Sequence, residues 1–347
     1  MKNKILILQN RPTTEFPQKI DNIFTQIIQD IPTKLNQNEF LLKVYYLSID
    51  PVMHVWLSGA PSYLPPLKKG ETIHSYGVGE VILSENDNWK IGDKCLANTG
   101  AQEYCLMDAQ RQQFVFRIPR KTSVEKCAFY LSFYNNWFVA YSGIKMVGQI
   151  KQKDTVLVSS AAGATGIVCV QLAKVLGAKR VIGITGSEEK VKFLKEKLGV
   201  DEVINYKKGD FFRELRKACP EGVDVYFDNV GEKMLDDVLK CMNLYGRVAL
   251  CGATSNYQDH KNRRGVYNLS LCVSKRIIVQ GVLASDAIPV FEEVQKFFQK
   301  NIENGNIKQI DHYFYGVENV SQAMQYCFMG KNIGKVLVNV NGGGAKL

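Results

Sequence analysis

The stretch "TVLVSSAAGATGIVCVQLAKVLG", residues 155–177, decides the fold. An aliphatic run, "TVLVSS", leads into a segment of two glycines and three alanines, and apolar residues with helical periodicity follow. This order predicts a buried strand, a turn that carries almost no side chains, and a helix. A turn so bare implies that another group must come very close to its backbone.

Strands and helices alternate on the C-terminal side of this turn. Between about residues 154 and 282, short aliphatic segments are separated by amphipathic ones. Such alternation predicts a parallel sheet covered by helices on both faces, which is the doubly wound α/β arrangement. The expected strands are "TVLVS", "RVIGIT", "EVINY", "VDVYFDNV", "GRVALCG" and "RIIVQGV".

The sequence on either side of this region has a different pattern. Residues 1–122 show short strands broken by turn residues, as in "FLLKVYYLSIDP", and predict a β-rich domain. Thr122 and Glu125 form a capping-box pair at a helix start, so we expect the α/β domain at residues 123–283. Residues 284–347 hold one clear helix, "PVFEEVQKFFQKNIENG", and short strands that we expect to return to the first domain.

The composition is that of a globular chain without membrane spans. The chain has 347 residues, of which 46% are apolar and 22% are charged, enough for about two domains. No apolar run reaches the roughly 20 residues of a membrane span, and the N-terminus predicts a first strand instead of a signal peptide. Nine scattered cysteines indicate free, mostly buried thiols in a reducing compartment, so we expect a cytoplasmic protein.

The net charge of +10 is spread through the expected helices and loops. Its densest group, "HKNRRG" at residues 260–265, fits a solvated loop, or a pocket for an anionic substrate or cofactor. Because these basic residues are not clustered with aromatic ones, we expect no nucleic-acid partner.

The bare turn predicts a dinucleotide site. A strand that turns directly into a helix points the unpaired N–H groups of the helix at the turn, and a phosphate is their natural partner. Gly163 lets a pyrophosphate approach the backbone, and Gly166 lets the helix pack tightly on the strand. We assign cofactor binding to Gly163, Ala164, Thr165 and Gly166, with Ala161 where the usual fingerprint has its first Gly.

The end of the second strand favours NADPH over NADH. NAD-selective sites place Asp or Glu there, about 20 residues past the turn. In this chain the position falls in "IGITGSEEK", where Gly186 and Ser187 leave room. Lys190 follows in the helix and is either a ligand of the 2′-phosphate or an ordinary exposed lysine. Glu188 and Glu189 stand close by, but as first-turn residues they favour the helix dipole and can point away.

These residues together resemble a known family. The pieces "YYLSIDPVMH", "GVGEV", "VLVSSAAGATG", "GSEEK", "INYKK", "YFDNVG", "CGATSNY" and "NIGKVLV" extend over nearly the whole chain. They are similar to the zinc-independent medium-chain dehydrogenase/reductases, in the group of leukotriene B4 dehydrogenase, prostaglandin reductase and alkenal double-bond reductase. The resemblance implies a GroES-like catalytic domain that is interrupted by a Rossmann domain.

Zinc ligands of the related metalloenzymes are missing from the sequence. Those enzymes use Cys and a His–Glu pair in the first domain and a lobe of four closely spaced Cys. The four histidines have no Cys partners at ligand spacing, so we expect structural or surface roles for them and no metal site. They are His54, His74, His260 and His312.

The resemblance also implies roles for individual residues. Lys190 and Tyr206 match positions that contact the 2′-phosphate, and Tyr257 and Tyr76 match tyrosines at the substrate. The positions that line the cofactor cleft are Asn229, Cys251, Gly252 and Asn332. The implied reaction is transfer of hydride from NADPH to the β-carbon of an α,β-unsaturated ketone or aldehyde. The Tyr257 phenol, protonated at neutral pH, would donate a hydrogen bond to the carbonyl oxygen.

Several departures from the family pattern fall near the expected pocket. "DPVMH" has Val52 and His54 where the family often has Tyr and Arg, and "WFVAY" has Trp137 and Val139 where it has Gly and Thr. A tryptophan at that glycine must fill part of the substrate pocket or displace the nicotinamide. The chain is therefore an active enone reductase with a reshaped pocket, an NADPH-binding accessory or structural subunit, or a quinone reductase of the same fold.

Two further expectations concern assembly and location. The last strand of the parallel sheet, "RIIVQGV", often extends a sheet across a two-fold axis in this family, so the resemblance implies a homodimer. The C-terminal residues Ala345, Lys346 and Leu347 resemble the Ser-Lys-Leu peroxisomal address, although three residues can match by chance.

Overall fold

The computed structural model describes residues 2–13, 16–60, 62, 65–257 and 264–341. The chain forms two compact units. Unit 1 comprises Met1–Phe133 and Asp311–Leu347, and unit 2 comprises Tyr134–Ile310. The domain borders expected from the sequence, after residues 122 and 283, lie before the borders of these units. They stay predictions, because a compact unit is defined by its packing, whereas a domain is defined by independent folding.

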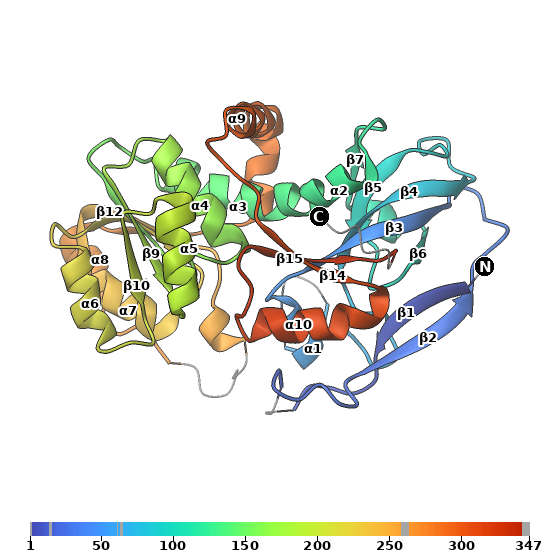
Figure 1. The fold of residues 1–347 in the computed structure, drawn as a ribbon, viewed down its shortest axis with the longest axis horizontal. Coiled ribbons are helices and arrows are strands. Elements are labelled where there is room, and N and C mark those ends of the chain that lie inside the picture. Colours follow the sequence, from blue (N-terminus) through green and yellow to red (C-terminus); the bar gives the residue numbers. More distant parts are fainter. Residues whose placement is uncertain (1, 14–15, 61, 63–64, 258–263, 342–347) are drawn as a thin grey trace. The chain divides into compact units, whose positions relative to one another are not determined.

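Unit 1 is built on a mostly antiparallel sheet with the order β14-β15-β3-β4-β5-β7, in which β6 also pairs with β3. A separate antiparallel pair, β1 and β2, contains the strand predicted at the N-terminus. Figure 1 shows α10 beside β14 and β15 in this unit. The elements are β1 (Lys2–Leu8), β2 (Phe24–Asp30), β3 (Phe40–Ile49), α1 (Met53–Ser58), β4 (Tyr76–Ser84), β5 (Lys94–Asn98), β6 (Tyr104–Met107), β7 (Val115–Ile118), α2 (Val124–Ser132), β14 (Asp311–Tyr315), α10 (Val320–Phe328) and β15 (Lys335–Asn339).

The core of unit 1 joins both ends of the chain. Leu42 and Leu47 of β3, Val81 of β4, Met324 of α10 and Val338 of β15 are fully buried in one apolar cluster. The segment after residue 310 therefore completes the sheet that the first 133 residues begin. This return of the chain is what the sequence predicted for its last strands.

Unit 2 is the doubly wound sheet that the sequence predicted. All six expected strands form, and they pair in parallel in the order β10-β9-β8-β11-β12-β13. The strands are β8 (Thr155–Val158), β9 (Arg180–Thr185), β10 (Glu202–Asn205), β11 (Val223–Asp228), β12 (Met242–Leu250) and β13 (Ile278–Gly281). Strand β12 begins earlier than the expected segment "GRVALCG".

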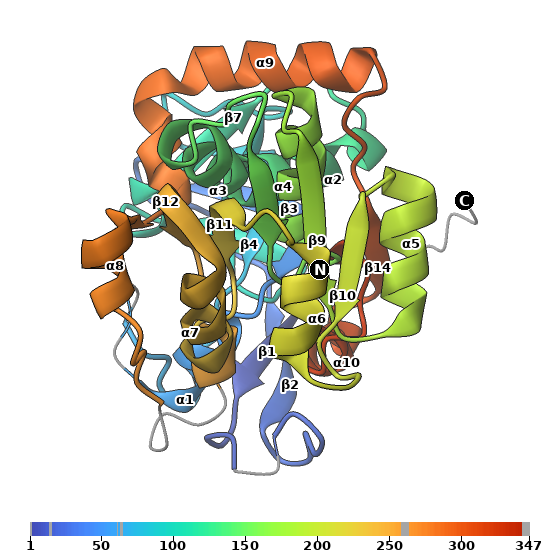
Figure 2. The ribbon, with the colours of Figure 1, turned by 90° about the vertical axis from the view of Figure 1, so that its left-hand side faces the viewer.

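Helices connect these strands on both faces of the sheet, as right-handed crossovers require. Figure 2 shows the helices around the sheet, with α9 across the top of the unit. The connecting helices are α4 (Ala164–Val175), α5 (Glu188–Leu198), α6 (Phe211–Ala218), α7 (Glu232–Cys241) and α8 (Ser270–Lys275), while α3 (Phe138–Tyr141) precedes β8 and α9 (Phe291–Glu303) follows β13. The short α8 was not expected from the sequence.

The helical segment that links the two units differs from the expectation in two ways. The predicted start is confirmed, but the side chain at the N-cap is Ser123, which accepts a hydrogen bond from Lys126 N, and not Thr122. Neighbouring hydroxyl residues compete for this position, and Ser123 has the extended backbone that a cap needs. The segment also contains two π-helical stretches, Phe133–Trp137 and Ser142–Val147, which periodicity did not reveal.

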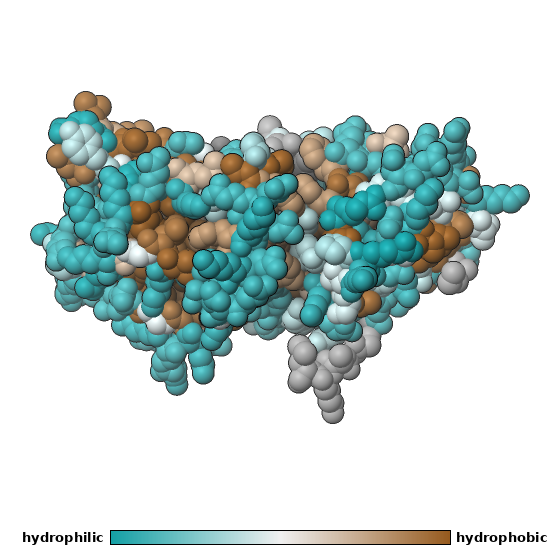
Figure 3. Space-filling view, turned by 90° about the horizontal axis from the view of Figure 1, so that it is seen from above, coloured by the Kyte–Doolittle hydropathy of each residue, from teal (hydrophilic) through white to brown (hydrophobic). Residues whose placement is uncertain are grey.

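The surface agrees with the composition. On the face drawn in Figure 3, hydrophilic residues predominate and apolar ones show between them. Among the described residues, no helix is long and apolar enough to cross a membrane. All nine cysteines are free thiols, six of them buried, as the sequence predicted.

Candidate functional site

The strand order of unit 2 reverses between β8 and β11. From β8 the chain proceeds outward to β9 and β10, then returns to β11 on the other side of β8. In an open parallel sheet this reversal leaves a crevice at the carboxyl ends of the two central strands, where ligands bind. The bare turn after β8 lies at that edge.

The turn itself is shaped to present backbone N–H groups. Ser160 adopts a positive φ of 49°, and Gly163 N donates to Ser160 O at 2.9 Å. Gly163 is the N-cap of α4 and supplies no side-chain hydrogen bond to the helix. The first N–H groups of α4, in Ala164, Thr165 and Gly166, are therefore left for a ligand. An anion is the favoured ligand at a helix start.

Close packing holds the start of α4 against the end of β8. A Cβ on Gly166 would lie 2.3 Å from Ser160 O and 2.7 Å from the Cα of Ala161. Only glycine fits there, which confirms the packing role predicted for Gly166. A Cβ on Gly183 in β9 would lie 2.9 Å from the Cβ of Ala161. The missing first glycine of the fingerprint is thus compensated by a glycine on the neighbouring strand.

A buried polar network ties the end of β8 to the end of β11. The carboxylate of Asp228, fully buried, accepts hydrogen bonds from the Tyr226 hydroxyl (2.7 Å), the Ser159 hydroxyl (3.2 Å) and the backbone N–H groups of residues 230 and 231. Asn229 donates its side-chain amide to Ser159 O at 2.7 Å. These hydrogen bonds hold the ends of β8 and β11 together at the crevice.

The loop after β12 is hydrogen-bonded to the loop after β11. Cys251 N and Gly252 N donate to Asp228 O at 2.8 and 3.1 Å, and the Thr254 hydroxyl donates to Asn229 O at 3.0 Å. Burial raises the pKa of the Cys251 thiol to about 12, so it is protonated at neutral pH. A Cβ on Gly252 would lie 3.5 Å from the Tyr257 hydroxyl, which places this phenol against the same loop.

The phenol of Tyr257 remains a hydrogen-bond donor at neutral pH. Burial raises its pKa above the ordinary value, and a hydrogen bond with the backbone of Ala253 offsets only part of that shift. A protonated phenol in a partly buried position matches the donor expected from the sequence.

The corner after β9 gathers several of the residues expected at a 2′-phosphate. Tyr206 packs its ring on Gly186, where a Cβ would lie 2.9 Å from the ring. Ser187 caps α5 by accepting from Lys190 N at 3.4 Å, and the Lys190 side chain is half-buried. Lys207 holds its ammonium group 5.9 Å from the centre of the Tyr206 ring. The corner is therefore basic and aromatic.

Glu188 is held by two partners, one at the end of β10 and one in the segment that follows it. Its carboxylate accepts from the Asn205 amide at 2.6 Å and pairs with the Lys208 ammonium group at 3.1 Å. These contacts hold the pKa of Glu188 below its usual value. The expectation that this glutamate can point away from the corner stays a prediction, because both partners are chain neighbours of Tyr206 and Lys207.

Asn136 stands beside the helix start and was not expected from the sequence. It lies in the first π-helical stretch, is 5% exposed, and donates from Nδ2 to the Thr165 hydroxyl at 3.0 Å. Its Oδ1 is buried and has no hydrogen-bond partner among the described residues. Leaving an acceptor buried and unpartnered costs about 1–3 kcal/mol, so the position fits a bound donor. The asparagine pair within an otherwise apolar helix was the available signal.

Two of the expected site residues belong to unit 1. Tyr76 begins β4, and burial and the charge of Asp50 raise its pKa. Asp50 also forms a buried ion pair with Lys335 and accepts from the Ser48 hydroxyl. Asn332 lies between α10 and β15 and donates its amide to Gly334 O at 2.6 Å. The roles of Tyr76 and Asn332 stay predictions.

The residues that depart from the family pattern pack into cores. The ring of Trp137 is 1% exposed and meets Phe298 of α9 edge-on at 4.8 Å, inside unit 2. The ring therefore packs against α9, and the expectation that it fills part of the substrate pocket or displaces the nicotinamide stays a prediction. Val139 is buried in α3, and His54 packs between Phe16 and Phe328 in the core of unit 1. Val52 is partly buried against that core.

The described residues do not fit a zinc ion. No group of three or more His, Cys, Asp and Glu side chains among them is arranged to hold a metal. His74 meets Trp56 edge-on, and His312 stacks on Tyr326 at 4.6 Å. His260 lies outside the described residues.

The structure brings most of the expected cofactor residues to one edge of unit 2. The turn, the corner after β9 and the loops after β11 and β12 all follow carboxyl ends of adjacent strands. They hold Gly163, Ala164, Thr165, Gly166, Gly186, Ser187, Lys190, Tyr206, Asn229, Cys251, Gly252 and Tyr257. Cofactor binding by each of them stays a prediction, while their shared location is a structural fact.

Comparisons with known proteins agree with this architecture. The family model described as "Zinc-binding dehydrogenase" matches residues 164–300, and "N-terminal domain of oxidoreductase" matches residues 4–115. The chain is 35% identical to a 2-alkenal reductase (NADP(+)-dependent) of Nicotiana tabacum, over 98% of each chain. It is 33% identical to prostaglandin reductase 1 of Oryctolagus cuniculus, over 87% of this chain and 84% of the relative.

A solved structure shows the same fold. The crystal structure of CurA in complex with NADPH from Vibrio vulnificus matches with a TM-score of 0.89 and 33% identity, over 97% of this chain and 99% of that one. Full-length similarity at this level, together with the two family models, leaves one assignment. The chain belongs to the medium-chain dehydrogenase/reductases, in their zinc-independent group.

Proposed function

We propose that the protein is an NADPH-dependent reductase of the C=C bond of α,β-unsaturated ketones and aldehydes. The observation that carries this proposal is the uncapped start of α4 at the strand-order reversal, with a basic, aromatic corner at the end of β9. Relatives named as a 2-alkenal reductase and as an NADPH-dependent curcumin reductase, and the NADPH complex of CurA, support the choice of reaction and cofactor.

The residues of unit 2 fit this cofactor. The N–H groups of Ala164, Thr165 and Gly166 would bind the diphosphate, because α4 leaves them without a cap. Lys190 and Tyr206 would hold the 2′-phosphate. The buried, unpartnered Oδ1 of Asn136 would accept a hydrogen bond from the cofactor. A cofactor donor at that point would repay the cost of burying this oxygen.

The chemistry follows from charge development on the substrate. NADPH, when bound, would supply the hydride for the β-carbon, and negative charge would build on the carbonyl oxygen. The Tyr257 hydroxyl would donate to that oxygen, stabilising the enolate in a dry site. Transfer of a proton from water to the α-carbon would complete the reduction of the double bond. Because burial raises the pKa of Tyr257, the donor is present throughout the neutral pH range.

Turnover of NADPH with a panel of small enones, enals and quinones tests the proposal. We expect oxidation of NADPH in preference to NADH, and a decrease in kcat of about 100- to 1000-fold in Tyr257→Phe. Tyr245→Phe is the matched control, because Tyr245 is 61% exposed on β12. Tight NADPH binding without turnover of any acceptor would instead indicate an accessory or structural subunit. Turnover confined to quinones would indicate a quinone reductase.

We further propose that the protein is a homodimer joined through β13. This edge strand pairs only with β12 among the described strands, and all its residues are exposed, with Ile278 at 58% and Val279 at 36%. An exposed apolar edge is a template for pairing with a second strand. Light scattering should give twice the chain mass for wild type and the monomer mass for Ile278→Lys. A monomeric wild type would refute the dimer.

We propose a cytoplasmic location, with import into peroxisomes as the alternative. The tripeptide Ala345-Lys346-Leu347 lies outside the described residues, so only its sequence supports import. A fluorescent reporter carrying these last residues should stay diffuse in the cytosol. Punctate peroxisomal signal would decide for the alternative.

A further inference from the structure

Unit 2 has a hollow of about 690 Å³ away from the bare turn. It is lined by the C-terminal parts of α4, α5 and α9 and by the segment that follows α9. The N-terminus of α4 forms the candidate cofactor site, so this hollow lies toward the other end of the same helix. Its volume is in the range of pockets that bind small molecules.

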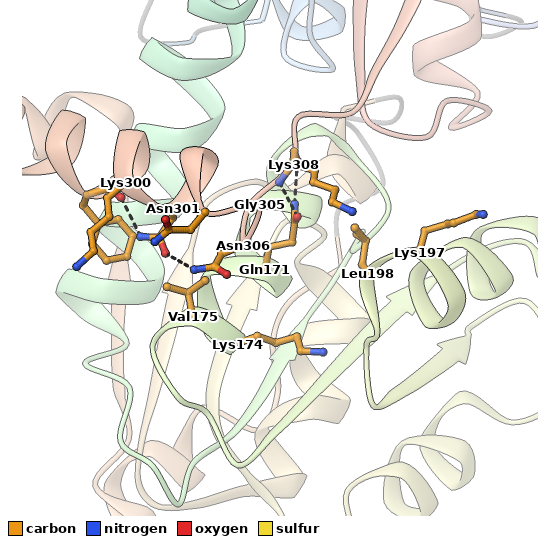
Figure 4. Close-up of a pocket in the computed structure, with 12 residues that line it drawn as sticks. Gln171, Lys174, Val175, Lys197, Leu198, Lys300, Asn301, Gly305, Asn306 and Lys308 are labelled. Atoms are coloured by element: carbon orange, nitrogen blue, oxygen red, sulfur yellow. Dashed lines mark hydrogen bonds between the residues drawn. The ribbon is translucent and has the colours of Figure 1, made fainter.

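The lining of the hollow is basic and contains no carboxylate. Four lysines contribute to it, and Figure 4 shows them around its rim, with Lys300 at one end, Lys197 at the other, and Lys174 and Lys308 between. Elsewhere in the unit many lysines are paired, for example Lys195 with Glu202 at 2.6 Å. Among the described residues no acidic side chain pairs with Lys197, Lys300 or Lys308.

Helix ends account for only part of this charge. Cations are favoured in the last turn of a helix, and Lys174 donates to the carbonyl of Gly199 at the end of α5. Lys308, however, lies beyond α9 in a segment without a helix. Lys308 is exposed and has no helix end to compensate, so its ammonium group is open to a ligand at the hollow.

The floor of the hollow is rigid and polar. Gln171 of α4 is 5% exposed, accepts from Lys308 N at 2.8 Å and donates to Lys308 O at 3.0 Å. Asn301 of α9 is buried, donates to Phe297 O at 2.8 Å and accepts from the Asn306 amide at 3.1 Å. Figure 4 shows these bonds beside Lys308 and Lys300. The backbone that carries Lys308 is thus fixed in place before any ligand binds.

We propose that this hollow binds a small molecule with two or more phosphate or carboxylate groups. Several ammonium groups spread along the rim match an extended anion better than a single charge, because one anionic group reaches only its nearest lysines. The site is separate from the proposed cofactor turn and does not depend on the proposed reaction.

Calorimetric titration with inorganic pyrophosphate and with citrate tests this proposal, with acetate as the monoanion control. Titrations run with and without saturating NADPH, since pyrophosphate can also occupy the cofactor turn. We expect both polyanions to bind in the presence of NADPH, and acetate not to bind. Raising the salt concentration should weaken the binding, because exposed charges are screened.

Substitution of the lysines tests whether the anion binds at the hollow. Lys308→Gln should weaken citrate binding by about tenfold, as expected for loss of one charge-assisted contact. The double variant Lys174→Gln/Lys308→Gln should weaken it further. Lys34→Gln/Lys121→Gln in unit 1 removes two exposed charges and is the matched control, which should bind citrate as wild type does.

The outcomes separate the possibilities. Unchanged citrate affinity in a folded Lys308→Gln variant would overturn the proposal, and so would absence of citrate binding to wild type. Equal loss in the control variant would show that net charge alone attracts the anion, which also overturns it. If NADPH fails to bind while the lysine variants still lose citrate, the proposed function fails and this site stands.

Discussion

Replacing Gly166 by alanine tests how the start of α4 binds the cofactor. The new Cβ would lie 2.3 Å from Ser160 O and 2.7 Å from the Cα of Ala161. Both are backbone atoms, so no side chain can rotate away to make room. Because ordinary Cβ contacts begin at 3.4 Å, the helix start must retreat by roughly 1 Å.

This retreat has two costs. Overpacking of a close contact destabilises a folded protein by about 1–3 kcal/mol. The same movement withdraws N–H groups from the diphosphate, and one hydrogen bond to a charged group contributes about 1.5–3 kcal/mol. Loss of one such bond lowers NADPH affinity by roughly 10- to 100-fold.

Calorimetric titration of NADPH and denaturant unfolding measure the two effects separately. Gly265→Ala is the control, because a Cβ there would meet no atom within 4 Å. It should keep the wild-type affinity and stability. A folded Gly166→Ala protein that binds NADPH as tightly as wild type would refute the diphosphate site at this helix start. An unchanged free energy of unfolding would refute the close packing.

Three further predictions use other parts of the structure. Asn136→Leu should raise the apo-protein Tm by about 2–4 °C, because it removes a buried unpartnered acceptor, and it should weaken NADPH binding about tenfold. The half-exposed Asn135→Leu is the control and should do neither. An Asn136→Leu protein that is less stable and binds NADPH with full affinity would contradict the assignment. Trp137→Ala should lower the free energy of unfolding by about 3–5 kcal/mol in denaturant titrations, because the ring is buried against α9. A loss below about 1 kcal/mol would contradict that packing. Burial opposes ionisation of Asp237, but two lysines of its helix outweigh burial and hold its pKa below the usual value. This carboxylate therefore stabilises the fold above its unfolded pKa of about 4. The free energies of unfolding of wild type and Asp237→Asn should converge as the pH falls below about 3. A difference between them that stays constant down to that pH would contradict the ion pairs.

The features that the sequence predicted are local ones. A buried strand, a bare turn and a helix follow one another within residues 155–177, so periodicity and glycine spacing were enough to place them. The cap of α2 marks the limit of this reasoning. Thr122 and Ser123 both carry a hydroxyl, and only the extended backbone at Ser123 decides between them.

The features that the sequence did not predict depend on distant partners. A π-helical turn inserts a residue and shifts the following side chains by about 100° around the helix axis. The stretch Phe133–Trp137 therefore presents Asn136 and Trp137 to faces that an ordinary helical count does not give. Phe298, which covers Trp137, lies on α9, far along the chain. No local pattern connects these two rings.

The pair Ala161 and Gly183 shows what the glycine fingerprint requires. The fingerprint is usually stated as letters along one turn, and by that rule Ala161 is a defect. The structure shows that the requirement is space between the turn and the next strand, where a Cβ on Gly183 would lie 2.9 Å from that of Ala161. One of the two positions must lack a Cβ, and either can be the one that does. Dinucleotide turns are therefore better recognised by reading the first two strands together than by counting glycines in the turn.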